Sequence, residues 1–357
     1  MRKVIVVDVE DRQFYNNQLF NPDIAIHYPG ALSLCRFYEL ATVAGYQVVT
    51  ADLVSEANID PRNTLIVTSD RMNWAEQLVH QGGILAALFC FETPPFAWRF
   101  YRDLSKISSR FQHVFLFPGA ALRVCVKATK FHPTLFPQPY CGISPSGRMN
   151  GWYERKFAAM VNSNIIQRRF MVKPEHMLAI LTDPDLRREL YSERRRAIRY
   201  FHSHEGFHLY GSGWDRWLFG VSYRDYKTAL NCWQGKCENK IKTLSGYRFS
   251  VCYDNTIFPG YITEKIFDCF YAGCVPIYYG APDICNYIPK ECFIDKRNFG
   301  SYRDLDRFLS QVGPTEFDAY RQAISDFLQS KVFEPFYQDH FANNLLASIE
   351  DCNTRQE

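Results

Sequence analysis

The fold is indicated by the stretch PGYITEKIFDCFYAGCVPIYYGAP, residues Pro259–Pro282. Apolar residues recur in it at helical spacing, at Ile266, Phe267 and Phe270. Gly273 marks the end of that pattern, and the apolar run CVPIYYG that follows has the length of a strand. A helix that leads directly into a buried strand is typical of a parallel α/β sheet.

The same alternation runs through the rest of the chain. Its first third holds the strand-like runs KVIVVDV, QVVTADL, NTLIVTSD, GILAALFCF and HVFLF, separated by helix-like segments such as GALSLCRFYELATVAGY and AWRFYRDLSKISSRF. Later strand-like runs are KFAAMVNSN, FHLYG, YRFSVCY and ECFID, and DPDLRRELYSERRRAIRYF is predicted as one helix capped by Asp183 or Asp185. Continuous apolar strands that alternate with helices predict parallel sheets covered on both faces.

A stretch rich in proline, glycine and serine, between about Pro118 and Gly151, interrupts the alternation, and we interpret it as a crossing between domains. The predicted fold class is therefore α/β, with two doubly wound, Rossmann-like domains facing a cleft. We predict domains at residues 1–150 and 151–330, followed by a C-terminal helix at 331–357. Ligands of such sheets bind at the carboxyl ends of the strands, which is where candidate site residues are sought.

The composition excludes several classes of protein. Of the 357 residues, 47% are hydrophobic and 16% aromatic, which is typical of a globular protein and not of a disordered or fibrous one. The formal net charge is only +3, whereas a nucleic-acid-binding protein usually carries a larger, clustered positive excess. No apolar run approaches the roughly 20 residues that span a bilayer, and the apolar part of the opening MRKVIVVDVED is too short for a signal peptide.

Three residue clusters invite a metal or phosphate interpretation. Cys232 and Cys237 lack a second cysteine pair, so we interpret the 12 cysteines as reduced core residues and not as zinc ligands. The histidines of HSHEGFH have no carboxylate–histidine helical motif beside them, and we expect them to be solvated turn residues. The arginines of RRELYSERRRAIRYF cannot all face one pocket, so most are expected in solvent, with one or two pointing at phosphates.

Polar residues follow several predicted strands. Asn162–Asn164 and Asp254–Thr256 each follow a strand of the second predicted domain, although either is also explained as an ordinary turn. Glu92 follows the long strand GILAALFCF of the first domain and places a carboxylate at the predicted cleft. An acid just before a helix start would also account for Glu92.

The start of the helix in the opening stretch has the chemistry of an anion site. Thr263 is a suitable cap, and the first turn presents unpaired N–H groups and a partial positive charge, to which Lys265 adds a full charge. Glu264 can accept hydrogen bonds from vicinal sugar hydroxyls, so the pair suits a nucleoside diphosphate. The alternative, which remains open from the residues alone, is that Glu264 complements the helix dipole and Lys265 is solvated.

The segment YRFSVCYDNTIFPGYITEKIFDCFYAGCVPIYYGAPDICNYIP, Tyr247–Pro289, resembles the signature block of the family 10 glycosyltransferases, the α-1,3/α-1,4-fucosyltransferases. That block runs from an aromatic strand through Glu-Asn-Ser/Thr and Tyr-hydrophobe-Thr-Glu-Lys to a helix, Gly, hydrophobe-Pro, a strand and Gly-x-Pro. The segments VNSN and LYGSGWD also resemble the family, as does FCFETPP, which is similar to its acidic Glu-Ser-Pro loop. The resemblance is strong from about Lys156 to Phe308 and weak before that.

The resemblance implies a GT-B fold in which the first domain binds the acceptor and the second binds GDP-fucose. By position, the residues that match donor-binding residues of the family are Asn164, Asn255, Tyr261, Glu264 and Lys265. An arginine of the YSERRRAIRYF helix is implied to reach the phosphates; we favour Arg194 and leave Arg195 and Arg196 open. The family's usual glutamate before the asparagine is Asp254 here, one methylene shorter.

The expected activity is an inverting transfer of L-fucose from GDP-fucose to a hydroxyl of a glycan that contains N-acetylglucosamine or glucose, of the α-1,3 type. Glu92 is the expected catalytic base, with Asp8 in reserve. Neither a metal cofactor nor a nucleic-acid partner is expected, and the acceptor is an oligosaccharide or glycan, lipid-linked or not. The chain lacks the membrane anchor of Golgi members and the heptad tail of some bacterial ones, so it is similar to a soluble bacterial or viral member, in the cytoplasm or peripheral at the membrane.

Three other interpretations stay open at this point. A GT-B transferase with a different nucleotide sugar would keep the fold and change the donor. A non-catalytic glycan- or nucleotide-binding protein would keep the cleft without the need for a diphosphate cradle. A dehydrogenase is suggested by Gly211–Gly213 after a strand, but the third glycine of the dinucleotide-binding motif is missing.

Overall fold

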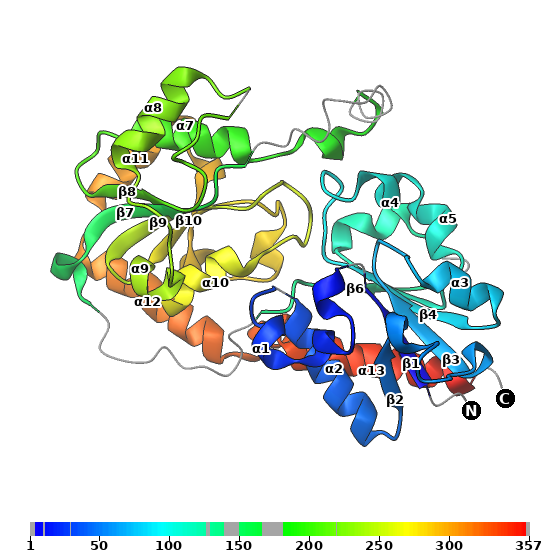
Figure 1. Ribbon diagram of the computed structural model, residues 1–357. Coiled ribbons are helices and arrows are strands. Elements are labelled where there is room, and N and C mark those ends of the chain that lie inside the picture. Colours follow the sequence, from blue (N-terminus) through cyan, green and yellow to red (C-terminus); the bar gives the residue numbers. More distant parts are fainter. Residues whose placement is uncertain are drawn as a thin grey trace. The chain divides into compact units, whose positions relative to one another are not determined.

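The computed structural model describes residues 4–9, 11–28, 30–125, 129–138, 150–165, 181–218 and 220–354. The predicted interdomain crossing lies partly outside the described residues. The chain divides into two compact units (Figure 1). The first unit contains Met1–Cys141 together with Glu334–Glu357, and the second contains Gly142–Phe333.

The first unit is built on a parallel sheet with the strand order β2-β1-β3-β4-β5-β6. Its strands are β1 (Val4–Asp8), β2 (Gln47–Thr50), β3 (Thr64–Thr68), β4 (Ile84–Cys90), β5 (His113–Leu116) and β6 (Lys130–Pro133). Its helices are α1 (Pro22–Ala25), α2 (Ala31–Val43), α3 (Ala75–His80), α4 (Trp98–Arg102), α5 (Leu104–Ser108) and α13 (Gln338–Thr354). The strands that the sequence predicts in this part are all present, because each is an apolar run that the sheet buries.

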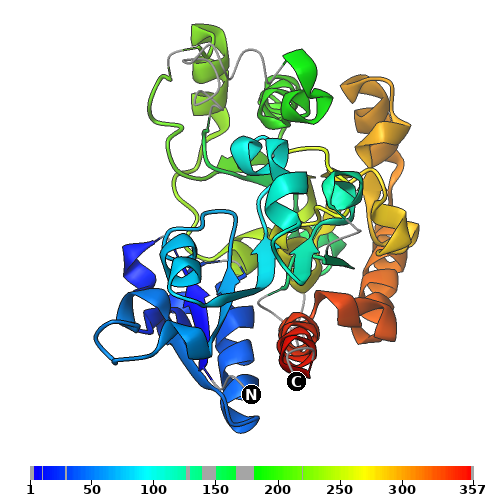
Figure 2. The same ribbon diagram turned by 90° about the vertical axis from the view of Figure 1, so that its right-hand side faces the viewer.

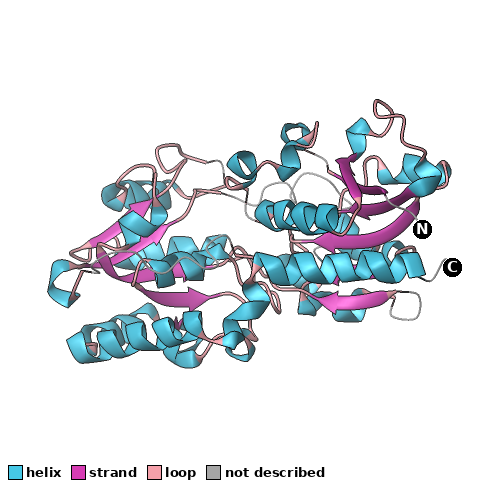
Figure 3. Ribbon diagram, turned by 90° about the horizontal axis from the view of Figure 1, so that it is seen from below, coloured by secondary structure: helices cyan, strands magenta, loops and turns pink. Residues whose placement is uncertain are grey.

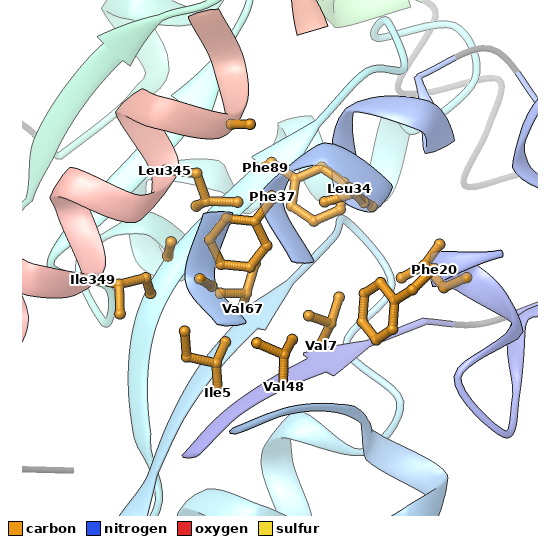
Figure 4. Close-up of a cluster of buried hydrophobic side chains, with 14 of the residues drawn as sticks. Ile5, Val7, Phe20, Leu34, Phe37, Val48, Val67, Phe89, Leu345 and Ile349 are labelled. Carbon is orange, nitrogen blue, oxygen red and sulfur yellow. The ribbon is translucent and has the colours of Figure 1, made fainter. Parts of the chain in front are cut away.

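The core of the first unit joins the two ends of the chain. Helices α2 and α13 lie side by side over one face of the sheet (Figures 1 and 2). Figure 4 shows Phe37 of α2 and Leu345 of α13 with sheet residues such as Val67 in one buried cluster. The first sheet therefore buries its apolar face only with the help of the last helix.

The second unit is built on a parallel sheet with the order β11-β10-β9-β7-β8. Its strands are β7 (Lys156–Val161), β8 (Phe207–Tyr210), β9 (Tyr247–Tyr253), β10 (Val275–Tyr279) and β11 (Ile294–Asp295). Its helices are α7 (Tyr191–Phe201), α8 (Tyr223–Cys232), α9 (Lys240–Leu244), α10 (Glu264–Tyr271), α11 (Tyr302–Gln311) and α12 (Pro314–Gln329). Strands flanked by helices are visible in both units in Figure 3, and the predicted α/β class is confirmed.

One predicted helix is interrupted. Asp183 caps only a short 3-10 turn, Pro184–Arg187, and α7 begins at Tyr191. The backbone between them pairs with the loop after β9: Ile257 N–H donates to the Arg188 carbonyl at 2.8 Å, and Leu190 N–H donates to the Asn255 carbonyl at 2.9 Å. These tertiary hydrogen bonds replace the helical ones and bring the start of α7 to the end of β9.

Gly211 sets the spacing between the ends of β7 and β8. Its φ is +131°, and a Cβ at this position would overlap the carbonyl of Asn162. Only glycine adopts this backbone without strain and without a clash. The segment after β8 can therefore lie directly against the residues that follow β7.

Candidate functional site

The candidate site lies at the carboxyl ends of strands in the second unit. Asn162–Asn164 follow β7, Asp254–Thr256 follow β9, and α10 begins a short loop later. Strand β9 lies between β7 and β10 in the sheet. These sequence clusters therefore meet at one edge of one sheet, which is where parallel α/β sheets bind their ligands.

The carboxylate of Asp254 joins three elements at this edge. It is buried, its Oδ1 accepts a hydrogen bond from the Thr263 hydroxyl at 2.5 Å, and its Oδ2 accepts one from the Tyr278 hydroxyl at 2.6 Å. The Tyr278 hydroxyl in turn accepts from the Ala281 N–H at 2.8 Å. Burial raises the pKa of Asp254, and Lys265 opposes that rise. Asp254 is thus a buried acceptor between β9, α10 and β10.

Arg194 of α7 belongs to a connected polar group beside this carboxylate. Its Nε and Nη2 donate to the Tyr253 carbonyl at 3.2 and 2.6 Å, and Nη2 also donates to Asn255 Oδ1 at 2.9 Å. Asn255 Nδ2 donates to the Tyr261 hydroxyl at 3.4 Å. Burial lowers the pKa of Arg194, but a guanidinium stays cationic in proteins. A buried cation, an amide and a phenol therefore stand together after β9.

The neighbouring arginines point elsewhere. Arg195 Nη1 donates to the carbonyl of Ile165 at 3.3 Å. Arg196 pairs with Glu193 at 2.9 Å, and 64% of its side chain is exposed. Of the three arginines that the sequence leaves open, Arg194 is the one in contact with Asn255.

Asn164 is held at the end of β7 by the glycine-rich segment after β8. Its N–H donates to the Ser212 carbonyl at 2.9 Å, and its Nδ2 donates to the Gly213 carbonyl at 3.1 Å. Its Oδ1 is buried and has no hydrogen-bond partner in the part of the chain that the structure describes. The amide is fixed in position and retains an unused acceptor.

The N-terminus of α10 presents two charged side chains next to Asp254. Thr263 caps the helix, and its hydroxyl accepts from Lys265 Nζ at 3.2 Å. Lys265 Nζ also lies 3.3 Å from Glu264 Oε1, and their side chains are only 17% and 16% exposed. Burial alone would favour the neutral acid, but Lys265 and Lys240 outweigh it and lower the pKa of Glu264 to about 2. Glu264 is therefore a carboxylate at every pH near neutrality.

Two charged residues beside the start of α10 were missed by the sequence reasoning: Asp268 of α10 and Lys240 of α9. Lys240, the first residue of α9, lies 3.1 Å from Asp268 Oδ2 and 3.7 Å from Glu264 Oε1. Burial raises the pKa of Asp268 to about 6, although Lys240 opposes this. The sequence carries one signal of the arrangement: Glu264 and Asp268 are four residues apart, so the two acids share a helix face and call for a cation.

The predicted catalytic base belongs to the first unit. Glu92 is the second residue after β4; its side chain is exposed, and its carbonyl accepts from the Tyr101 hydroxyl at 2.9 Å. Asp8, the reserve candidate, is fully buried at the end of β1, where it accepts from the N–H groups of Trp74 and Ala75. Asp8 thus anchors the start of α3, and Glu92 is the more accessible of the two acids.

Packing accounts for two histidines of the cluster. His204 stacks on Phe157 with ring centroids 3.8 Å apart, and His208 Nδ1 lies 2.9 Å from the Tyr247 hydroxyl, so neither is merely a solvated turn residue.

Most of the described cysteines are buried, as predicted, but Cys125 and Cys237 are only partly buried and Cys285 is exposed, so the prediction that all cysteines are core residues is wrong for these three. Within the described ranges, no group of three or more His, Cys, Asp or Glu side chains is placed to hold a metal ion.

Comparisons with known proteins give the following matches. Residues 188–332 match the model described as glycosyltransferase family 10 (fucosyltransferase), C-terminal part. The resemblance to this family is confirmed over that range. The chain is 31% identical over 113 residues to α-(1,3)-fucosyltransferase FucT of Helicobacter pylori, which is 31% of this chain and 23% of that protein. It is 33% identical over 84 residues to the α-(1,4)-fucosyltransferase of Arabidopsis thaliana, which is 22% of this chain and 21% of that protein.

The matched segment spans less than a quarter of the length of these two relatives. The segment that matches the family model, residues 188–332, contains Arg194, Asn255, Tyr261, Glu264 and Lys265, while Asn164 and Glu92 precede it. The structure of Anabaena Alr3699/HepE in complex with UDP and glucose is similar over 98% of this chain and 100% of its own, with a TM-score of 0.52 and 11% identity. That likeness extends over both units and confirms the GT-B type of α/β fold.

A transmembrane helix is not found among the described residues, because none of their helices combines the required length with sufficient apolar character.

Replacing Asp254 by alanine should loosen the start of α10. The change leaves the hydroxyls of Thr263 and Tyr278 buried without their acceptor, which we expect to lower the free energy of unfolding by about 2–4 kcal/mol. Chemical denaturation measures this, with Asp318→Ala as the control, since the Asp318 side chain is 67% exposed and its loss should cost less than about 0.5 kcal/mol. Equal small effects of both substitutions would contradict the role given to Asp254.

Proposed function

We propose that the protein is an inverting, metal-independent fucosyltransferase that transfers L-fucose from GDP-fucose to a hydroxyl of a glycan containing N-acetylglucosamine or glucose. The observation that carries the proposal is the group Arg194–Asn255–Tyr261 beside the α10 N-terminus with Lys265. These residues lie within the segment that matches the fucosyltransferase family model.

The cations of the second unit suit a departing diphosphate. Arg194 and Lys265 supply two fixed positive charges, and the first turn of α10 adds N–H groups and the positive end of the helix dipole. As the bond between the sugar and the β-phosphate breaks, negative charge grows on the leaving GDP. Charges already in place stabilise that change without reorganising in the transition state.

Glu264 and Asn164 suit the hydroxyl groups of the donor. Glu264 is held as a carboxylate by its two lysine neighbours and so can accept hydrogen bonds but not donate them. Asn164 keeps a buried acceptor oxygen at the end of β7. Vicinal hydroxyls of a ribose or a fucose are the donors that such acceptors take.

Glu92 is proposed as the general base. The acceptor hydroxyl oxygen forms a bond to the anomeric carbon of fucose while the bond from that carbon to the β-phosphate oxygen breaks, and GDP leaves with the electron pair. The hydroxyl proton passes to the carboxylate of Glu92. Attack from the face opposite the leaving group inverts the anomeric configuration.

Product analysis tests the whole proposal. The protein is incubated with GDP-fucose and a lactosamine-type acceptor, with and without EDTA, alongside GDP-mannose, UDP-glucose and UDP-galactose. We expect a fucosylated product, of α-1,3 linkage by NMR, at the same rate in EDTA, because Arg194 and Lys265 replace a divalent cation at the diphosphate. Transfer from another donor only would contradict the choice of fucose, and complete loss in EDTA that metal restores would contradict the cation assignment.

Lys265→Ala should reduce turnover by roughly 10²-fold or more at saturating donor, because a preorganised charge of this kind is worth a few kcal/mol in the transition state. Steady-state kinetics measures the effect. Lys242→Ala is the control, since Lys242 is exposed on α9 and should leave turnover unchanged. If Lys265→Ala preserves both turnover and GDP affinity, the diphosphate binds elsewhere.

Glu92→Gln keeps the shape of the side chain and removes its basicity, so transfer should fall by about 10²- to 10⁴-fold. GDP-fucose should still bind with unchanged affinity, measured by calorimetry, because Glu92 lies outside the donor unit. Glu56→Gln, at another exposed position of the first unit, is the matched control. Near-normal transfer by Glu92→Gln would disprove this assignment.

A further inference from the structure

Helix α10 carries two acids on one face of its first turns. Glu264 and Asp268 are four residues apart, and their side chains are only 16% and 3% exposed. Like charges at this spacing repel each other, and burial adds to the cost of keeping both ionised. A donor-binding carboxylate at position 264 therefore needs a device that keeps it charged and in place.

Lys240 reaches both acids from the neighbouring helix. Its Nζ lies 3.1 Å from Asp268 Oδ2 and 3.7 Å from Glu264 Oε1. Asn239 caps α9, and Lys240 is the first residue of that helix, so the cap fixes the backbone of Lys240. Lys265 approaches the same oxygen, Glu264 Oε1, at 3.3 Å. Lys240 and Lys265 thus each contact the same oxygen of Glu264, and they do so from different helices.

We propose that Lys240 is a positioning residue of the donor site, which neutralises Asp268 and holds Glu264 ionised and oriented towards a hydroxyl of the nucleotide sugar. This inference rests on the proposed function. It gives Lys240 a role distinct from that of Lys265: Lys265 stands at the diphosphate, whereas Lys240 acts on the donor through Glu264.

The charges and the space around Lys240 support an indirect role. Two lysines and three carboxylates meet here: Lys240 is matched by Asp268, while Lys265 faces both Glu264 and the buried Asp254. The cavity that Lys240, Lys265 and Asp268 line measures about 10 Å³, close to the least that holds one water molecule.

The electrostatics of Glu264 agree with this geometry. The groups that face it are Lys265 and Asp268 of its own helix, Lys240 of α9 and the buried Asp254 after β9. Burial would raise the pKa of Glu264, yet Lys265 and Lys240 together lower it to about 2. Without Lys240, the buried Asp268 would lose the cation that lies 3.1 Å from it, and Glu264 would lose one of its two lysine neighbours.

A set of variants tests the inference: Lys240→Met, Lys240→Arg, Glu264→Gln and the double variant Lys240→Met/Glu264→Gln, with Lys242→Met as the control on the same helix. Lys240→Met should weaken GDP-fucose binding, measured by calorimetry, about 10-fold, as expected for coupled residues of one network. The turnover at saturating donor should stay within about twofold of the normal value, so the effect falls on KM. Lys240→Arg should restore most of the affinity, and Lys242→Met should change nothing.

The double variant separates positioning from direct binding. If Lys240 acts through Glu264, the added loss from Lys240→Met in the Glu264→Gln background should be less than about twofold. An equal loss in both backgrounds would overturn the inference, because Lys240 would then bind the donor itself. An affinity that Lys240→Arg fails to restore, together with a lowered unfolding temperature, would also overturn it and leave Lys240 a structural role only.

A ligand-free measurement distinguishes failure of this inference from failure of the proposed function. In protein with ¹³C-labelled glutamate, Lys240→Met should raise the pKa of the Glu264 carboxyl by about 1–3 pH units. An unchanged pKa overturns the inference whatever the donor affinity. A raised pKa combined with normal GDP-fucose binding by Glu264→Gln would instead show that Glu264 is not a donor ligand, which contradicts the proposed site and with it the role of Lys240 there.

Discussion

The buried carboxylate of Asp254 is the contact on which the arrangement of the site depends. It accepts the hydroxyl of Thr263, which caps α10, and the hydroxyl of Tyr278 in β10. Its two chain neighbours hold Arg194, one through a carbonyl and one through a side-chain amide. A single acid therefore fixes the helix start that carries Glu264 and Lys265 relative to the arginine of α7. A longer side chain at this position would have to displace the hydroxyls that now surround it.

Around this fixed point the site is organised by charge. Arg194 is almost fully buried and donates to two neutral acceptors, the Tyr253 carbonyl and Asn255 Oδ1, so these hydrogen bonds do not cancel its charge. At α10, by contrast, lysines and carboxylates alternate and compensate each other. Arg194 attracts an anion together with Lys265 and the N-terminus of α10, whereas the carboxylate of Glu264 is an acceptor for hydroxyl groups. A nucleotide sugar offers both an anionic diphosphate and hydroxyl groups, so the edge of the second sheet suits this class of ligand.

The strands could be predicted best from the sequence. Continuous apolar runs such as those of β4 and β9 are stable only where both faces of the strand are buried, as in the middle of a parallel sheet. The helices were less accessible. The segment before α7 has helical periodicity, yet its backbone pairs with the loop after β9, and that pairing depends on a partner more than 60 residues away. The sequence motif around Thr263 identified the donor-binding candidates. Lys240 was not identified, because its contacts with Glu264 and Asp268 form only when α9 packs on α10. A residue whose role depends on packing between two helices is difficult to recognise from the sequence around it.

The chain order imposes one more constraint. The second unit lies within the sequence of the first, since residues after Phe333 return to the first sheet. Phe341, Leu345 and Ile349 of α13 are buried in the first core, and Arg36 of α2 pairs with Asp339 at 3.0 Å. A large share of the apolar face of the first sheet would be exposed without this helix, and exposed apolar area costs about 25 cal/mol per Å². The unit that carries Glu92 can therefore complete its core only after the whole second unit has been made, so the proposed base and the proposed donor site depend on the folding of one continuous chain.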